Sequence, residues 1–251
     1  MTTNMNPLVS VVIPTYNHAH LLKDALHSVI CQTYTNIEII VIDNNSVDDT
    51  EEVVSSFLDP RIIFKKINNN GIIAASRNMG ILTAKGDYIA FCDCDDLWKE
   101  NKLKFQLNYM KQFDLNFSYT SYDIVDEDNN VINMRNAPSN INFTKLRNSC
   151  DIGLSTVIIK KNILEKNQYR FASLKTKEDY VLWLKLALDG IEMKGIQQNL
   201  SSWRKNKNSL SSSTFQKLID GYKVYRLYLG YSPLKSLFYL TVLSINFILK
   251  N

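Results

Sequence analysis

Two cysteines and three aspartates lie within five consecutive positions, Cys92 to Asp96, in the stretch AFCDCDDLW. The thiols could hold a soft metal or form a redox pair, whereas the carboxylates could hold a hard cation such as Mg²⁺ or Mn²⁺. A structural zinc site usually needs four Cys or His ligands, and the sequence offers no further pair at the usual spacing. Because side chains alternate along a strand, we expect both thiols to pack inside and Asp93 and Asp95 to face a metal together. Ordinary turn or cap aspartates are the alternative.

The composition is that of one globular domain. A chain of 251 residues fits one large α/β domain or a domain with a small appendage. Hydrophobic residues make up 45% and charged residues 22%, which is ordinary for a soluble folded protein. Four cysteines are few for this length, and MTTNMNPLVS lacks the charged and apolar parts of a signal peptide. We expect a cytoplasmic protein with reduced thiols.

Positive charge is concentrated near the C-terminus. The net charge of +4 is too small to indicate a nucleic acid partner, but residues 199–251 carry eight Lys and Arg and one acid. This end predicts an anionic partner, either a membrane surface or a phosphate-bearing ligand. Residues 237–249 are 13 uncharged residues, fewer than the roughly 18 needed to cross a bilayer. They are expected to lie on a membrane surface or to pack on the domain.

Strands and helices alternate through the first hundred residues. Short β-branched runs predict strands, and apolar residues at helical spacing predict helices between them. The alternation favours a mostly parallel sheet with helices on both faces, which binds ligands at the carboxyl ends of its strands. Asp43 and the Cys92–Asp96 cluster both follow strands, so they should face one crevice. The predicted strands are 9–13, 37–42, 61–67, 88–92, 117–125 and 154–159, and the predicted helices are 19–30, 50–58, 72–84, 178–188 and 214–229.

Three stretches of the sequence, read together, resemble a known family. They are VSVVIPTYNHAHLLKDALHSVICQTYTNIEIIVIDNNSVDDT, NNGIIAASRNMGILTAKGDYIAFCDCDDLW and KEDYVLWLKLALDG. Their order and spacing resemble the family 2 inverting glycosyltransferases of the GT-A fold. The resemblance implies a Rossmann-like, mostly parallel sheet flanked by helices. It divides residues 1–212 into a nucleotide-binding half (about 8–110) and an acceptor half (about 111–212), followed by a basic, apolar helical segment at 213–251.

The resemblance also implies where a nucleotide diphosphate sugar and its metal would bind. Asp95 becomes the direct ligand of Mn²⁺ or Mg²⁺, with Asp93 toward the ribose or the metal shell. Arg77 would approach the base or the phosphates, unless it is a helix-surface arginine in a salt bridge. The other residues expected near the nucleotide are Pro14, Thr15, Tyr16, Asn17, Asp43 and Asn44.

Catalysis is expected from the pair Glu178 and Asp179. An acceptor hydroxyl is weakly acidic and needs a general base within hydrogen-bond reach. In the family a carboxylate of such a pair, at the start of a late helix, does this work, and Asp179 matches it. A single displacement would invert the anomeric carbon and give a β-linked product from an α-linked donor. Simple capping of the helix by both acids is the alternative.

The sequence departs from the family pattern at two places. Asn44 stands where a second aspartate often contacts uracil, although an amide oxygen can still accept from uracil N3–H. Asn206 stands where a histidine often holds the diphosphate, which leaves Arg204, Lys205 and Lys207 as candidates to neutralise phosphate. Asp96 could belong to the metal shell, contact the acceptor, or cap a helix beginning near Trp98. Trp98 and Trp203 could stack on a sugar or pack in the core.

The expected enzyme transfers glucose or galactose from a UDP-sugar to an undecaprenyl diphosphate-linked saccharide, as in O-antigen or capsule synthesis. It would work at the inner face of the cytoplasmic membrane as a peripheral protein. A sugar nucleotidyltransferase is a competing interpretation, but such enzymes carry a Gly-rich, Arg-containing loop after the first strand, and PTYNHAHLL has no glycine. A non-catalytic sugar-binding domain is a third interpretation, which does not require both acidic pairs in one crevice.

Overall fold

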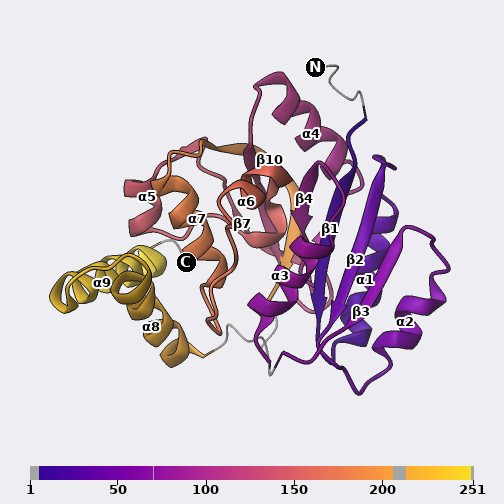
Figure 1. The fold of residues 1–251 in the computed structure, drawn as a ribbon, viewed down its shortest axis with the longest axis horizontal. Coiled ribbons are helices and arrows are strands. Elements are labelled where there is room, and N and C mark those ends of the chain that lie inside the picture. The colour runs from indigo at the N-terminus through magenta and orange to yellow at the C-terminus, as the bar shows by residue number, and fades with distance from the viewer. Residues whose placement is uncertain (1–5, 70, 206–212, 250–251) are drawn as a thin grey trace.

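The computed structural model describes residues 6–69, 71–205 and 213–249. In this part of the chain a ten-stranded sheet runs through the molecule with helices on both faces (Figure 1). The strands are β1 (Val9–Thr15), β2 (Ile37–Asp43), β3 (Ile62–Lys66), β4 (Tyr88–Phe91), β5 (Leu97–Trp98), β6 (Phe117–Val125), β7 (Val131–Arg135), β8 (Asn140–Ile141), β9 (Ile158–Lys160) and β10 (Met193–Arg204). The helices are α1 (Ala19–Ile30), α2 (Thr50–Ser56), α3 (Ile73–Thr83), α4 (Lys102–Gln112), α5 (Phe143–Asn148), η1 (Leu154–Thr156), α6 (Lys161–Lys166), α7 (Glu178–Leu188), α8 (Thr214–Lys223), η3 (Val224–Tyr228) and α9 (Pro233–Leu249).

The N-terminal half of the sheet is parallel. Strand β1 lies between β2 and β4, and β3 extends the sheet beyond β2, with all three pairings parallel. Every residue of β1 and β2 is buried, as expected where helices cover both faces. The predicted α/β architecture with a mostly parallel sheet is confirmed.

The C-terminal half of the sheet mixes directions. Strand β9 pairs antiparallel with both β4 and β6, whereas β6 and β10 run parallel to each other. The strand predicted at 154–159 is only partly correct, because 154–156 form the 3₁₀ turn η1 and β9 begins at Ile158. The turn forms because the carbonyl of Gly153 accepts hydrogen bonds from both the backbone N–H and the hydroxyl of Thr156.

The helix expected near Trp98 begins later. Leu97 and Trp98 form the short strand β5, which pairs antiparallel with Ser202 and Ser201 of β10. The following helix, α4, starts at Lys102. Pairing with a strand that lies about one hundred residues later is not encoded in the local pattern, so this prediction was wrong at its boundary.

The core has two parts, one on each face of the sheet. Phe117 and Trp183 belong to the part that packs against α3 and α7, and their rings lie 5.1 Å apart. Ile13 and Leu26 belong to the part beneath α1 and α4, and both thiols of the acidic cluster are buried in it. Burial raises the pKa of the Cys92 thiol well above its usual range, and does the same for its neighbour at 94. Protonated, buried thiols fit the predicted packing role.

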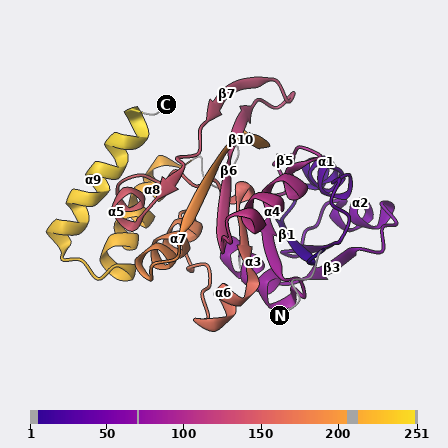
Figure 2. The ribbon, with the colours of Figure 1, turned by 90° about the horizontal axis from the view of Figure 1, so that it is seen from above.

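The C-terminal segment packs on α5 through α9 and on α7 through η3, where the hydroxyls of Tyr225 and Tyr180 lie 3.3 Å apart. It lies at the end of the molecule opposite α2 (Figures 1 and 2). Tyr225 and Leu243 join the same core part as α7. The helix predicted at 214–229 is α-helical only to Lys223 and continues as the π-helical turn η3. No helix among the described residues is long and apolar enough to cross a membrane. The predicted boundary at 212 lies outside the described residues.

Candidate active site

A cavity of about 700 Å³ opens at the carboxyl ends of β1 and β4, in front of the first turn of α7. Its walls carry Asp93 and Asp95 from the acidic cluster and Glu178 and Asp179 from α7. The sheet therefore brings together two acidic motifs that are far apart in the sequence. A binding domain without catalysis does not require this arrangement, whereas group transfer between two bound substrates does.

One wall of the cavity is the PTYN turn that follows β1. Asn17 has left-handed backbone geometry (φ 52°), and its N–H donates to Ser46 Oγ at 2.8 Å. Its side-chain oxygen accepts from Val47 N at 2.9 Å, so the turns after β1 and β2 are tied together. Each of the four residues predicted here for nucleotide contact lines the cavity, namely Pro14, Thr15, Tyr16 and Asn17.

The turn after β2 presents Asn44, not Asp43, to the cavity. Asp43 is fully buried, does not line the cavity and accepts from the backbone N–H of Ser46 at 3.1 Å. The side-chain oxygen of Asn44 accepts from Asn69 N at 2.9 Å. The group of Asn44 that is left for a ligand is then its amide N–H₂, a donor that suits a carbonyl oxygen of a base. This differs from the acceptor role toward uracil N3–H that the sequence suggested.

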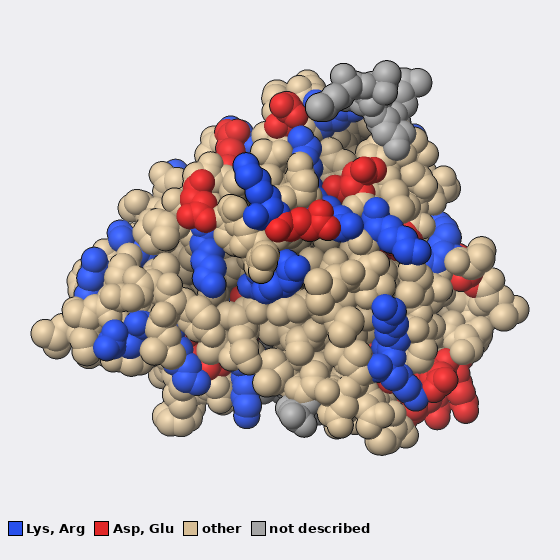
Figure 3. Space-filling view, in the orientation of Figure 1, with Lys and Arg blue, Asp and Glu red and all other residues tan. Residues whose placement is uncertain are grey.

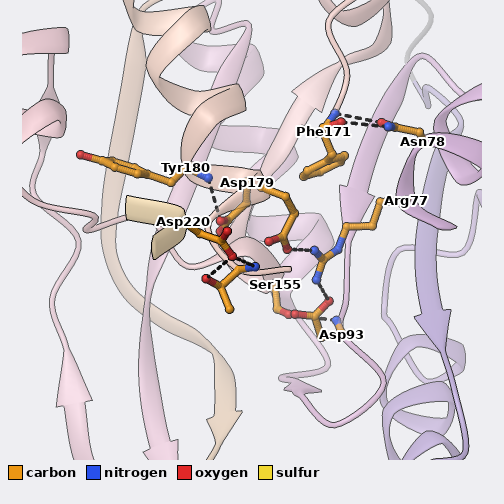
Figure 4. Close-up of polar contacts among 10 residues, drawn as sticks. Arg77, Asn78, Asp93, Ser155, Phe171, Asp179, Tyr180 and Asp220 are labelled. Atoms are coloured by element: carbon orange, nitrogen blue, oxygen red, sulfur yellow. Dashed lines mark hydrogen bonds and ion pairs between the residues drawn. The ribbon is translucent and has the colours of Figure 1, made fainter. Parts of the chain in front are cut away.

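Arg77 connects the two acidic motifs (Figure 4). From α3, its Nη2 lies 2.6 Å from Asp93 Oδ1, and its Nη1 contacts Glu178 Oε1. The guanidinium is buried and lies 5.6 Å from the centroid of the Phe171 ring. Arg77 is therefore no helix-surface arginine, and its charge is used to hold Asp93 and Glu178 in fixed positions along the cavity wall.

The carboxylates of Asp93 and Asp95 are hard oxygen donors at one place in the cavity wall. Burial and the negative charge of Asp93 raise the pKa of Asp95 to about 6, and Asp95 forms no ion pair within the described ranges. The buried hydroxyl of Thr15 lies on the same cavity. No three His, Cys, Asp or Glu side chains of the described residues gather into a complete metal site. This donor set fits a Mg²⁺ or Mn²⁺ ion that takes its remaining oxygens from water and a bound diphosphate.

Asp96 links β5, β10 and η1. It is buried, accepts from Ser155 Oγ at 2.5 Å and from the backbone N–H of Arg204 at 3.3 Å. Burial raises its pKa, with the charges of its two aspartate neighbours adding to the rise. Helix α4 begins six residues later, with Asn101 at its cap position. Asp96 lines the cavity, but both of its oxygens are taken up by these hydrogen bonds, and it does not cap a helix.

The structure separates the roles of Glu178 and Asp179. Glu178 is taken up by Arg77, whereas Asp179 accepts from the backbone N–H of Tyr180 through Oδ1 at 2.7 Å. Its second oxygen has no partner among the described residues, and the residue lines the cavity. Burial raises the pKa of Asp179, with Arg77 and Lys177 opposing the rise. A partly buried carboxylate of raised basicity with one oxygen left over is suited to accept a proton. Neither acid caps the helix, since Lys177 occupies that position.

Three other predicted contacts do not reach the cavity. Trp98 is buried, with its Nε1 donating to Ser155 O at 2.8 Å, so its ring packs in the core. The guanidinium of Arg204 lies behind the wall, 3.0 Å from Asn129 Oδ1. Lys205 is exposed and does not line the cavity, and Lys207 lies outside the described residues.

Trp203, which the sequence left to stack on a sugar or to pack, lines the cavity and is 37% exposed. Other lining residues were not named from the sequence. Lys217 and Phe247 reach it from the C-terminal segment, and Lys175 and Lys177 reach it from the approach to α7. Only tertiary packing places α8 and α9 beside this cavity, and the excess of basic residues near the C-terminus was the one hint in the sequence.

Comparison with known proteins yields a family and close relatives. The family model described as "Glycosyl transferase family 2" matches residues 10–168. The chain is 34% identical over 236 residues to the E. coli UDP-Glc:alpha-D-GlcNAc-diphosphoundecaprenol beta-1,3-glucosyltransferase WfgD, covering 93% of this chain and 90% of WfgD. It is 32% identical over 227 residues to the putative teichuronic acid biosynthesis glycosyltransferase TuaG of Bacillus subtilis, with 89% of each chain covered.

Solved structures share the fold at lower identity. S. aureus TarS in complex with UDP-GlcNAc matches with a TM-score of 0.75 and 21% identity over 92% of this chain and 70% of the TarS chain. The mannosyltransferase PcManGT from Pyrobaculum calidifontis, in complex with GDP-Man and Mn²⁺, matches with a TM-score of 0.70 and 16% identity over 94% of this chain and 70% of its own. These matches cover nearly all of the sheet and the helices around it.

Proposed function

Because the chain belongs to glycosyl transferase family 2, we propose that it transfers a hexose from a UDP-sugar to a lipid diphosphate-linked saccharide in the synthesis of a cell-surface polysaccharide. WfgD and WfaP, each 34% identical to this chain, are named as glucosyltransferases that use UDP-Glc and α-D-GlcNAc-diphosphoundecaprenol. TuaG is named for teichuronic acid biosynthesis. Glucose is therefore the first donor sugar to test, followed by galactose.

One observation carries the proposal. A single cavity holds a hard carboxylate pair, Asp93 and Asp95, together with Asp179, whose second carboxylate oxygen is not used by the described residues. Arg77 bridges the two groups through Asp93 and Glu178, which fixes their relative positions (Figure 4). A donor held at the first group and an acceptor at the second would meet between them.

The proposed reaction is a single displacement. Asp179 accepts the proton of an acceptor hydroxyl through its unused oxygen, and the hydroxyl oxygen bonds to the anomeric carbon as the bond to UDP breaks. Attack from the face opposite UDP inverts the anomeric carbon and gives a β-linkage from an α-linked donor. Arg77 fixes Glu178 next to the base and Asp93 next to the diphosphate. A divalent ion at Asp93 and Asp95, when bound, supplies positive charge to the leaving diphosphate.

We also propose that the protein acts as a peripheral protein on the cytoplasmic face of the membrane. Leu243 anchors α9 on the domain, while Phe238 and Ile248 are 61% and 71% exposed. Over the C-terminal helices, at the lower left of Figure 3, the charged side chains are mostly Lys and Arg. An exposed apolar helix face beside basic residues is suited to an anionic lipid surface.

A transfer assay tests the proposed reaction. The wild type, Asp179→Asn and Asp95→Ala are compared with UDP-glucose and UDP-galactose, Mn²⁺ and a short-chain GlcNAc diphosphate lipid, with the exposed Glu52→Gln as the control. We expect a β-linked disaccharide from the wild type and the control, a loss of about 10²–10⁴ in rate for Asp179→Asn, and loss of Mn²⁺ stimulation for Asp95→Ala. An α-linked product, identified by NMR, would rule out the displacement at Asp179.

A further inference from the structure

Two lysines line the cavity on the side formed by α7 and α8. Lys177 precedes the first turn of α7 in left-handed geometry (φ 62°), and Lys217 lies on α8. Neither forms an ion pair with an acid of the described residues, although the structure contains ten such pairs elsewhere in that part of the chain. The charge of Lys177 is felt by Asp179, whose pKa it lowers, but no salt bridge with a described residue neutralises either lysine. Two such cations on one side of a cavity favour an anionic ligand.

Packing holds both side chains at this place. The backbone of α8 runs along the aliphatic part of the Lys177 side chain at Gly221. A Cβ atom placed on this glycine would lie 3.6 Å from Lys177 Cε. The Nζ of Lys177 lies 5.8 Å from the centroid of the Tyr180 ring, and the Nζ of Lys217 lies 5.8 Å from that of the Phe247 ring. Each ammonium therefore lies near an aromatic face and forms no salt bridge with a described residue.

The two ammonium groups also act on each other. Burial lowers the pKa of Lys217, and the positive charge of Lys177 lowers it further. Like charges brought together in a partly buried place cost free energy that a bound anion recovers. Lys175, which is exposed and lines the same cavity, adds a third positive charge to this side.

The position of the lysines decides which substrate they would meet. Lys177 is two residues from Asp179, where the acceptor hydroxyl must lie, and the nucleotide wall at the PTYN turn comes from other elements. In a lipid diphosphate-linked acceptor the diphosphate is attached to the sugar ring that carries the reacting hydroxyl. Phe247, which also lines the cavity, belongs to α9, whose outer face exposes Ile248 and Leu249. The cavity thus leads from Asp179 to the two lysines and on to the apolar face of α9. This order matches the sugar, the diphosphate and the lipid of such an acceptor.

We propose that Lys177 and Lys217 form the subsite that binds the diphosphate of the acceptor. The inference rests on the proposed function, because it assigns one part of the acceptor to one part of the same cavity. It deepens that function by naming residues that select a diphosphate-linked sugar over an uncharged one.

The experiment compares Lys177→Gln, Lys217→Gln and Lys217→Arg in the full chain with Lys235→Gln, a control on α9 that does not line the cavity. The acceptors are octyl diphosphate-linked GlcNAc and octyl GlcNAc without phosphate. Each Gln variant should raise the acceptor KM about tenfold for the diphosphate compound only, as expected for one lost charge-assisted contact. Lys217→Arg and Lys235→Gln should stay near the wild type. The donor KM should not change in any variant.

A binding measurement keeps the test independent of turnover. Each lysine variant is combined with Asp179→Asn, and its affinity for the diphosphate compound is measured by calorimetry against Asp179→Asn alone. A weaker affinity in both Gln variants supports the subsite. An unchanged affinity, or a rise in donor KM in place of acceptor KM, overturns it. If the wild type transfers no hexose but the Gln variants still bind the diphosphate compound more weakly, the proposed reaction fails while the subsite stands.

Discussion

Lys102 should make the stability of this protein depend on pH. Its side chain has no exposed surface, and its Nζ donates to Gln106 Oε1 at 2.7 Å and to Thr156 O at 3.2 Å. No carboxylate pairs with it within the described residues, and burial lowers its pKa from 10.5 to about 7. A neutral partner set does not offset the cost of burying the charge.

The sign and size of the effect follow from this lowered pKa. Between pH 7 and pH 10.5 the unfolded chain holds a proton on Lys102 that the folded chain has released, so the free energy of unfolding rises with pH. Below pH 7 the buried charge of Lys102 lowers the free energy of unfolding by its full amount, about 5 kcal/mol for a pKa shift of this size. Above pH 10.5 this loss disappears. From pH 7 to pH 9 the gain in stability is about 2 kcal/mol.

Denaturant unfolding of the wild type and Lys102→Met at pH 7, 8 and 9 measures this gain. Met fills a similar volume without a charge. The stability of Lys102→Met therefore varies with pH only through the other titrating groups, which the wild type shares. The exposed Lys104→Met, on the same helix, is the control for loss of a surface charge. We expect the difference between Lys102→Met and the wild type to shrink by about 2 kcal/mol over this range. A constant difference would mean that Lys102 keeps its proton in the folded protein, and the reasoning would be wrong.

Three further changes test other parts of the structure. Arg77→Met leaves two buried or half-buried acids without their cation, so it should lower the free energy of unfolding by about 3–5 kcal/mol, measured by denaturant unfolding. A denaturation midpoint equal to that of the wild type would contradict the bridging role of Arg77 between Asp93 and Glu178. Trp203→Ala should raise the acceptor KM several-fold in the transfer assay while Trp203→Phe stays near the wild type, because Trp203 lines the cavity; equal KM values would assign the ring to packing. Phe238→Asp with Ile248→Asp should reduce sedimentation with anionic vesicles, since both side chains are exposed on α9; unchanged sedimentation compared with a Val131→Asp control would exclude this face.

The sequence determined the bounds of several elements and named several acidic residues of the site. The bounds of α1, β6 and α7 agree with the prediction, because apolar spacing within one element is a local property. The GT-A resemblance is confirmed by the family match and by the shared fold. Asp93, Asp95 and Asp179 were named from the sequence, and all of them line one cavity. The first two lie there because they follow the carboxyl end of β4, whereas Asp179 is brought there by the first turn of α7.

Only the tertiary structure decided which polar side chains face the cavity. Asp43, Trp98 and Arg204 are turned away from it by hydrogen bonds to Ser46, Ser155 and Asn129. These partners lie 3 to 75 residues away along the chain, and a local pattern does not record which of the competing bonds a side chain will make.

The same limit explains the C-terminal segment. Its composition predicted an apolar, basic helix but left open whether it would contact a membrane or the domain. In the structure Leu243 is buried against the domain, while Phe238 on the same helix is exposed. The packing of α9 on α5 and of α8 on α9 also brings Lys217 and Phe247 to the cavity. Composition states which chemistry a segment carries, whereas the contacts between distant elements decide where that chemistry acts.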